Sequence, residues 1–275
     1  MLSEIVIKVE NLTKKFETGT VALKNVSLEV PKGQMMALIG LSGSGKSTLM
    51  RHLNGLTSPT SGDIYVLGTH VNAADKQQLR AVRHQVGFIF QQFGLVGRIT
   101  AIENVLSGAL GSLRGPRFGV ASYPLELRKR ALEHLDRVGL ADYAFQRADT
   151  LSGGQMQRTA IARSLMQEPS IMLADEPVAS LDPESSAQVM DIMLRIAKEE
   201  ALTVVVTLHQ VELALGWADR IVGLRDGEVV LDDAPKKIGK KKVMEVYQRV
   251  APEGEDPAKL AAESIHKLEM LKNAD

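Results

Sequence analysis

The sequence predicts an α/β fold in which a mainly parallel sheet is covered by helices on both faces. Short apolar segments, typical of buried strands, alternate with segments of helical periodicity along most of the chain. One such strand, residues 35–39, leads directly into a glycine-rich loop, and a helix is expected over residues 47–54, ending at Gly55. Sheets of this kind bind ligands at the carboxyl ends of their strands, so the loop marks the end of the sheet where a site is expected.

The glycine-rich loop is Gly40-Leu41-Ser42-Gly43-Ser44-Gly45-Lys46-Ser47-Thr48. It fits the phosphate-binding pattern of a glycine, four residues of any type, and Gly-Lys-Ser/Thr. Glycines allow backbone N–H groups to approach phosphate oxygens, and the following helix directs the positive end of its dipole at the same anion. Lys46 adds a full positive charge, and the hydroxyl of Ser47 is suited to Mg²⁺. The alternative is a glycine-rich turn that binds nothing, and the strand and helix on either side disfavour it.

The remaining elements follow from the hydrophobic periodicity. Strands are expected over residues 5–9, 26–30, 64–67, 86–90, 171–174 and 203–207, and helices over residues 127–138, 155–166 and 189–196. Ser61-Gly62-Asp63 is interpreted as a turn, residues 111–122 as an exposed loop, and Asp226-Gly227 as the turn of a hairpin that joins residues 221–224 to 229–231. The run from residue 91 to 167 is therefore interpreted as a helical insertion in an α/β domain.

Composition limits the classes of function. The chain has 275 residues, of which 44% are hydrophobic, and this is enough to bury a full core. The formal net charge is zero, which argues against nucleic acid as a partner. There is no cysteine, no apolar run long enough to span a bilayer and no signal-peptide pattern at the start, so we expect a soluble, cytoplasmic protein.

Two polar segments follow predicted strands. Asp175-Glu176 comes after the strand 171–174, and His209 just after 203–207. Because the carboxyl ends of parallel strands meet at one edge of a sheet, we expect these residues to share a site with the loop. The alternatives are that Asp175-Glu176 is an acidic turn that ends its strand and that His209 is a structural histidine.

A second glycine motif is Leu151-Ser152-Gly153-Gly154-Gln155, at the start of a predicted helix. Taken alone, it is either an anion-binding helix N-terminus or a plain N-cap by Ser152. The order of phosphate loop, this pentapeptide and an apolar strand ending in Asp-Glu resembles the ATP-binding-cassette (ABC) ATPases. The resemblance covers about residues 5–250. It implies a P-loop NTPase core of the ABC type, with an N-terminal antiparallel β subdomain and an inserted helical subdomain.

The resemblance also implies roles for single residues. Lys46 and the loop hold the phosphates of ATP, and Ser47, Gln91 and Asp175 complete a Mg²⁺ site. Glu176 acts as the catalytic carboxylate and His209 as the switch histidine that contacts the γ-phosphate. Ser152, Gly153, Gly154 and Gln155 close over ATP held by the opposite subunit of a homodimer, and Ser180-Leu181-Asp182 resembles the D-loop. Phe16 takes the place of a tyrosine that often stacks on adenine.

A narrower resemblance is to the ATP-binding subunits of phosphonate importers. Arg51-His52-Leu53, residues 176–184 and residues 206–211 carry it, with Leu-His-Gln where many importer ATPases have Thr-His-Asp. It implies a hydrolase coupled to transport, peripheral on the cytoplasmic face of the membrane, that contacts permease subunits and, indirectly, a substrate-binding protein. The expected cargo is a phosphonate, phosphate or phosphite. The alternatives are an ABC ATPase of another transporter, whether an importer of different cargo or a lipoprotein-release or efflux system, and a soluble ABC ATPase outside transport.

The domain organisation follows from the same resemblance. An ABC ATPase domain is expected over residues 1–250, with its helical subdomain at about 92–167, followed by a helical tail over 251–275.

Overall fold

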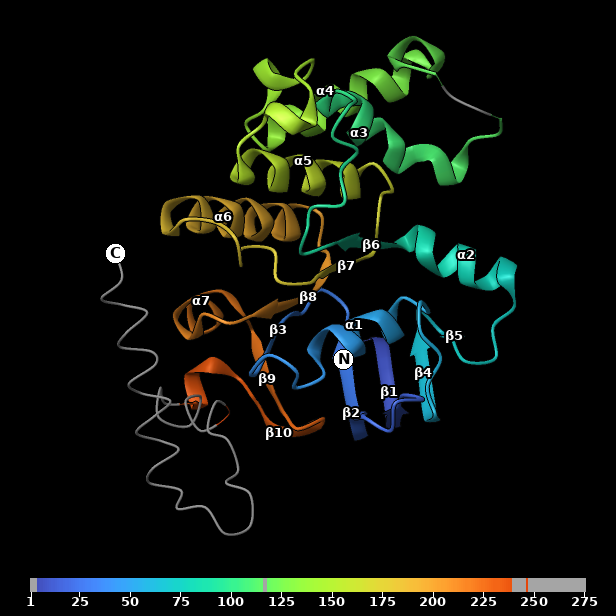
Figure 1. Cartoon of the computed structure of the whole chain (residues 1–275), viewed down its shortest axis with the longest axis vertical. Coiled ribbons are helices and arrows are strands. Elements are labelled where there is room, and N and C mark those ends of the chain that lie inside the picture. The colour runs from blue at the N-terminus through green and yellow to red at the C-terminus, as the bar shows by residue number, and fades with distance from the viewer. Residues whose placement is uncertain (1–3, 116–117, 239–245, 247–275) are drawn as a thin grey trace.

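The computed structural model describes residues 4–115, 118–238 and 246, and within them the strands form two sheets (Figure 1). The larger sheet has the strand order β10-β9-β3-β8-β7-β6. Its strands are β3 (Met35–Ile39), β6 (Val86–Ile89), β7 (Ile171–Ala174), β8 (Thr203–Leu208), β9 (Arg220–Arg225) and β10 (Glu228–Asp233). All neighbouring pairs are parallel except β9 and β10, which form the hairpin expected around Asp226-Gly227. The predicted α/β class is confirmed.

The two faces of the larger sheet belong to two hydrophobic cores, because side chains alternate along a strand. Met36 and Leu38 of β3 pack with the N-terminal sheet and with the helix that follows the glycine-rich loop. Met35, Ala37 and Ile39 of the same strand pack on the opposite face, with the helices of the second half of the chain. All five residues of β3 are buried, as expected for a strand covered on both faces.

The smaller, antiparallel sheet has the order β2-β1-β4-β5. It consists of β1 (Ile5–Lys15), β2 (Val21–Pro31), β4 (Ser61–Val66) and β5 (Thr69–His70). The turn predicted at residues 61–63 is wrong, because Ser61 pairs with Thr13 and Asp63 with Glu10. Two consecutive residues of β1 bulge out between these pairs, and Gly62 has a φ of 88° there. Gly62 faces this bulge from the opposite strand, and a Cβ atom there would lie 2.4 Å from the carbonyl oxygen of Asn11, so the close approach and the positive φ both require glycine.

Helices complete the fold: α1 (Lys46–Leu53), α2 (Lys76–Gln85), α3 (Ala101–Ser107), α4 (Leu125–Arg137), α5 (Gly153–Leu165), α6 (Pro183–Glu199) and α7 (Val211–Trp217). Single 3₁₀ turns lie at residues 108–112, 120–122, 141–143, 148–150 and 235–237. Figure 1 shows α3, α4 and α5 gathered at one end of the molecule, with α6 between them and the larger sheet. Helices thus follow β6 as predicted, whereas the boundaries of the subdomain and of the ABC ATPase domain stay predictions.

The tail predicted over residues 251–275 lies outside the described residues. Within the part of the chain that the structure describes, no helix is both long enough and apolar enough to traverse a bilayer.

Candidate functional site

The glycine-rich loop joins the end of β3 to the start of α1, as the sequence predicts. Gly45 is the N-cap of α1 and has a φ of 106°. A Cβ atom at this position would lie 2.5 Å from the carbonyl oxygen of Ala22 in β2. Glycine is therefore required here both by the left-handed backbone and by the close approach of the N-terminal sheet.

Lys46 lies inside the loop, with only 4% of its surface exposed. Its Nζ donates hydrogen bonds to the carbonyl oxygens of Gly40, at 2.9 Å, and Leu41, at 3.0 Å. Burial lowers the pKa of Lys46, and the nearby carboxylates of Glu176 and Asp175 oppose that shift. The loop thus concentrates a cation and the N-terminus of a helix, which together suit an anion.

Asp175 follows β7 and comes within hydrogen-bonding distance of the loop. The hydroxyl of Ser47 donates to Asp175 Oδ1 at 3.0 Å, and the hydroxyl of Thr207 donates to the same oxygen at 2.9 Å. Only 7% of Asp175 is exposed. Residues separated by 128 positions in the sequence are therefore joined at one edge of the sheet.

Glu176 is held by three groups from two other segments. Its Oε2 accepts a hydrogen bond from Gln91 Nε2 at 2.7 Å, and its Oε1 lies 2.5 Å from His209 Nε2. Its backbone N–H donates to the hydroxyl of Thr207 at 2.6 Å. Glu176 has a φ of 49°, which is costly for a residue with a Cβ atom. The structure therefore fixes both the backbone and the carboxylate of Glu176.

A cavity of about 240 Å³ opens at this edge of the sheet. Its lining comes from β2, from the glycine-rich loop and from the residues that follow β6 and β7: Ala22, Ser42, Gly43, Gly45, Lys46, Ser47, Thr48, Gln91 and Glu176. The structure thus brings the loop, Asp175-Glu176 and His209 together, whereas their roles in binding and catalysis stay predictions. Ala22 was not anticipated, since a small residue in an antiparallel strand carries no signal of its contact with a distant loop.

Two of the predicted segments lie elsewhere. Ser152 forms a capping box with Gln155 at the start of α5, the plain N-cap considered as an alternative. Neither residue lines the cavity, and neither does Phe16. Phe16 is 41% exposed, and Lys14 Nζ lies 5.3 Å from its ring centroid. The binding roles of these residues stay predictions.

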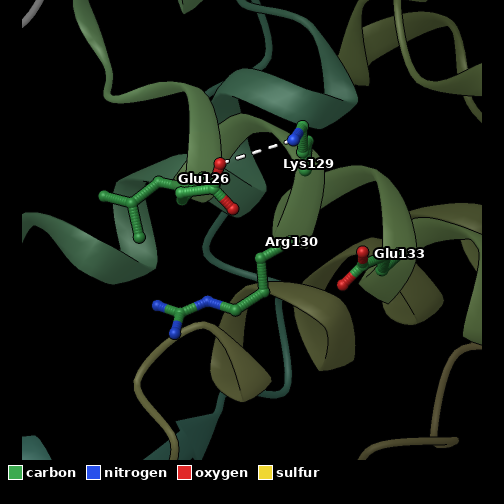
Figure 2. Close-up of a pocket in the computed structure, with 5 residues that line it drawn as sticks. Glu126, Lys129, Arg130 and Glu133 are labelled. Atoms are coloured by element: carbon green, nitrogen blue, oxygen red, sulfur yellow. Dashed lines mark hydrogen bonds and ion pairs between the residues drawn. The ribbon is translucent and has the colours of Figure 1, made fainter.

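A second hollow, of about 260 Å³, lies along α4 and is lined by Glu126, Leu127, Lys129, Arg130 and Glu133 (Figure 2). Figure 2 shows acidic and basic side chains interleaved along the helix. Glu126 pairs with Lys129 at 3.4 Å, and Arg130 pairs with Glu168. Because the charges are mixed and largely paired, this hollow lacks the positive character that an anion site needs.

Comparison with known proteins identifies the family of the chain. A family model described as ABC transporter matches residues 23–179. The chain belongs to the ABC transporter family. The phosphate-import ATP-binding protein PhnC of Mycolicibacterium smegmatis is 59% identical, over 90% of this chain and 94% of that protein. The phosphonates import ATP-binding protein PhnC of Nocardia farcinica is 54% identical, over 96% of this chain and 98% of that protein.

Solved structures of ABC cassettes have the same fold. A dimeric post-hydrolysis state of the ATP-binding cassette MJ0796, bound to ADP and phosphate, superposes with a TM-score of 0.74 at 38% identity, over 83% of this chain and 98% of that chain. The cassette cbiO1 from Clostridium perfringens gives a TM-score of 0.76 at 28% identity, over 88% of this chain and 94% of that chain. The predicted ABC ATPase fold and family are therefore confirmed. The chain is an ATP-binding ABC ATPase, an enzyme that couples ATP hydrolysis to transport.

Proposed function

We propose that this ABC ATPase energises the import of a phosphorus oxyanion across the cytoplasmic membrane. Three curated relatives above 50% identity carry names of this kind, one for phosphate import and two for phosphonates import. Phosphate, phosphonates and phosphite all present anionic oxygens on phosphorus, and this shared chemistry defines the proposed class of cargo. The chain works on the cytoplasmic face, peripheral to the membrane, together with membrane-spanning permease subunits and, through them, a substrate-binding protein.

One observation supports the catalytic part of the proposal: Glu176 is held at the edge of the loop cavity between Gln91 and His209. Phosphoryl transfer to water depends on positioning and on charge stabilisation more than on covalent chemistry. Glu176 orients the attacking water and accepts its proton as a general base. Lys46 and the loop N–H groups stabilise the charge on the β- and γ-phosphates. His209 contacts the γ-phosphate and helps to hold the water.

The same edge of the sheet suits Mg²⁺. Ser47 Oγ and Asp175 Oδ1 lie 3.0 Å apart and are both oxygen donors, the type that Mg²⁺ prefers. The described residues hold no grouping of three or more His, Cys, Asp or Glu side chains with metal-binding geometry. A metal bound with few protein ligands and with the phosphates of its nucleotide is the usual pattern for Mg²⁺. Ser47, Asp175 and Gln91 would hold the ion, which would neutralise charge on the phosphates.

The second half of each site comes from a second copy of the chain in this proposal. Ser152 is exposed at the start of α5, where the helix N-terminus and the adjacent glycines suit a phosphate. Gly153 and Gly154 pack against the segment 181–185, since a Cβ atom at either would lie 3.1–3.2 Å from Leu181 or Ser185. The segment that resembles the signature motif and the one that resembles the D-loop therefore form one surface. ATP held by one copy is closed by this surface of the other.

The test is ATPase stimulation in the reconstituted complex of this chain, its permease and its binding protein. The complex is challenged with a phosphonate, phosphate, phosphite and, as the control, an amino acid. Stimulation by one or more of the phosphorus oxyanions, with none by the amino acid, is expected. Activity that responds to none of the four, or equally to the amino acid, would overturn the proposed cargo class.

A further inference from the structure

Thr207 occupies an unusual position for a hydroxyl group. It lies in β8, in which all six residues are buried, and none of its surface is exposed. A hydroxyl buried in an apolar strand is costly unless both its hydrogen-bonding capacities are used. The hydroxyl of Thr207 uses both, and its two partners are consecutive residues of the active site.

The register of the sheet explains this position. Ala174, the last residue of β7, pairs with Val206 of the neighbouring parallel strand β8. Asp175 and Thr207 are the next residues of the two segments, so they lie side by side just past the last β7–β8 pair, while Thr207 still pairs with Leu38 of β3. The hydroxyl of Thr207 donates to Asp175 Oδ1 at 2.9 Å and accepts the backbone N–H of Glu176 at 2.6 Å.

We propose that Thr207 is a positioning residue for hydrolysis, one that holds Asp175 and Glu176 in register with the phosphate loop. Its bond to the Glu176 N–H pins the peptide at which the backbone turns into the left-handed region, with a φ of 49°. That conformation is unfavourable for a residue with a Cβ atom and persists only where the surroundings hold it. The proposal rests on the hydrolytic role proposed above for Glu176.

Thr207 and His209 then act on the same residue from one strand end. Thr207 holds the backbone of Glu176, and His209 lies against its carboxylate. One carboxylate oxygen of Asp175 accepts hydrogen bonds from the hydroxyls of both Thr207 and Ser47. Through Asp175, Thr207 therefore also links β8 to the phosphate loop. Loss of the hydroxyl leaves the phosphate loop itself intact but frees the two acidic residues to shift relative to it.

The test compares three variants of the full chain. Thr207→Val removes the hydroxyl and keeps the shape, and Thr207→Ser keeps the hydroxyl. Thr203→Val is the matched control, because Thr203 is 1% exposed in the same strand and its hydroxyl accepts the N–H of Gly33 at 2.9 Å, at the opposite end of the sheet. Each variant is assayed for kcat, for ATP affinity and for hydrogen exchange at the Glu176 amide by NMR.

We expect Thr207→Val to lower kcat by about 10- to 100-fold, the scale of a small displacement of a catalytic group. Its ATP affinity should stay within about threefold of wild type, because the loop provides the phosphate contacts. The Glu176 amide should exchange at least about tenfold faster than in wild type or in Thr203→Val, since its hydrogen bond is lost. Thr207→Ser should restore the protection of the Glu176 amide and most of kcat, because serine keeps the hydroxyl. If Thr207 acted only through its methyl group, which serine lacks, Thr207→Ser would restore neither.

Two results would overturn the proposal. One is a Thr207→Val chain in which kcat and Glu176 exchange both match Thr203→Val. The other is a Thr207→Ser chain as slow and as unprotected as Thr207→Val. If wild type itself fails to hydrolyse ATP, the proposed function fails, while the exchange experiment still decides whether Thr207 holds Glu176.

Discussion

Replacement of His134 by leucine should remove a specific acid sensitivity from the fold. His134 lies on α4 and is 9% exposed, and within the described residues neither of its ring nitrogens has a hydrogen-bond partner. Burial, followed by the positive charges of Arg137 and Arg130, lowers the pKa of His134 from 6.5 to about 4, and Glu168 only weakly opposes this. The folded protein therefore holds this imidazole neutral where the unfolded chain protonates it.

The sign of the effect follows from proton linkage. The unfolded chain binds a proton at His134 below pH 6.5, whereas the folded protein does so only near pH 4, so stability falls as the pH drops through this window. Between pH 7.5 and pH 5.0 these two values correspond to a loss of about 2 kcal/mol in the free energy of unfolding. This loss is the contribution of His134 alone, and the contributions of other titrating groups add to it.

The assay is urea unfolding of wild type and His134→Leu at pH 7.5 and pH 5.0. Between pH 7.5 and pH 5.0, the free energy of unfolding should fall by about 2 kcal/mol less in the variant than in wild type. Gln157→Leu is the matched control, because Gln157 on α5 is fully buried and, within the described residues, both of its amide atoms lack partners, yet it does not titrate. A His134→Leu chain whose pH-dependent loss equals that of wild type and of Gln157→Leu would refute the reasoning.

Two further predictions concern the nucleotide site. Lys46→Ala should raise the Kd for ATP by about 10- to 100-fold in equilibrium binding, because a charge-assisted contact is worth about 1.5–3 kcal/mol; an unchanged Kd would show that Lys46 does not hold phosphate. Ser152→Arg should block hydrolysis while the isolated monomer keeps its ATP affinity, because Ser152 lies outside the loop cavity. A large loss of monomer affinity in Ser152→Arg would contradict the composite site.

The parts of the fold that could be predicted from the sequence are those with a local signal. The loop between β3 and α1 has glycines where the backbone requires them, as at Gly45, and β3 and β8 are apolar because both of their faces are covered. No helix is predicted at α2 or α7, and α3 is covered only as part of the helical insertion, although α2 and α3 begin with capping boxes at Asp75 and Thr100. α2 buries only Val82, so its sequence lacks an apolar stripe. α3 buries Ile102, Val105 and Leu106 on one face, but it is only seven residues long.

The sequence predicts which acidic and histidine residues belong to the site, but not all of the hydrogen bonds that hold them. The strand ends predict that Glu176 and His209 share a site, and a hydrogen bond joins them. Gln91, expected there from the family resemblance alone, donates to the same carboxylate. No feature of the sequence marks Thr207, because a single hydroxyl in a β-branched run is typical of an ordinary strand. Its role depends on the register of β8 against β7, which a single sequence does not specify. Residues 61–63 form a strand opposite a bulge of β1 and not the predicted turn for the same reason, since pairing with β1 decides it.

The most direct test of the central claim, that this chain hydrolyses ATP with Glu176 as the proton acceptor, is the turnover of Glu176→Gln. Glu133→Gln, at an exposed glutamate on α4, serves as the matched control. Glu176→Gln should lower kcat by about 10²–10⁴-fold, the usual contribution of a general base. It should still bind ATP and should accumulate as an ATP-bound dimer, whereas Glu133→Gln should behave as wild type. Near-wild-type turnover in Glu176→Gln would contradict the account.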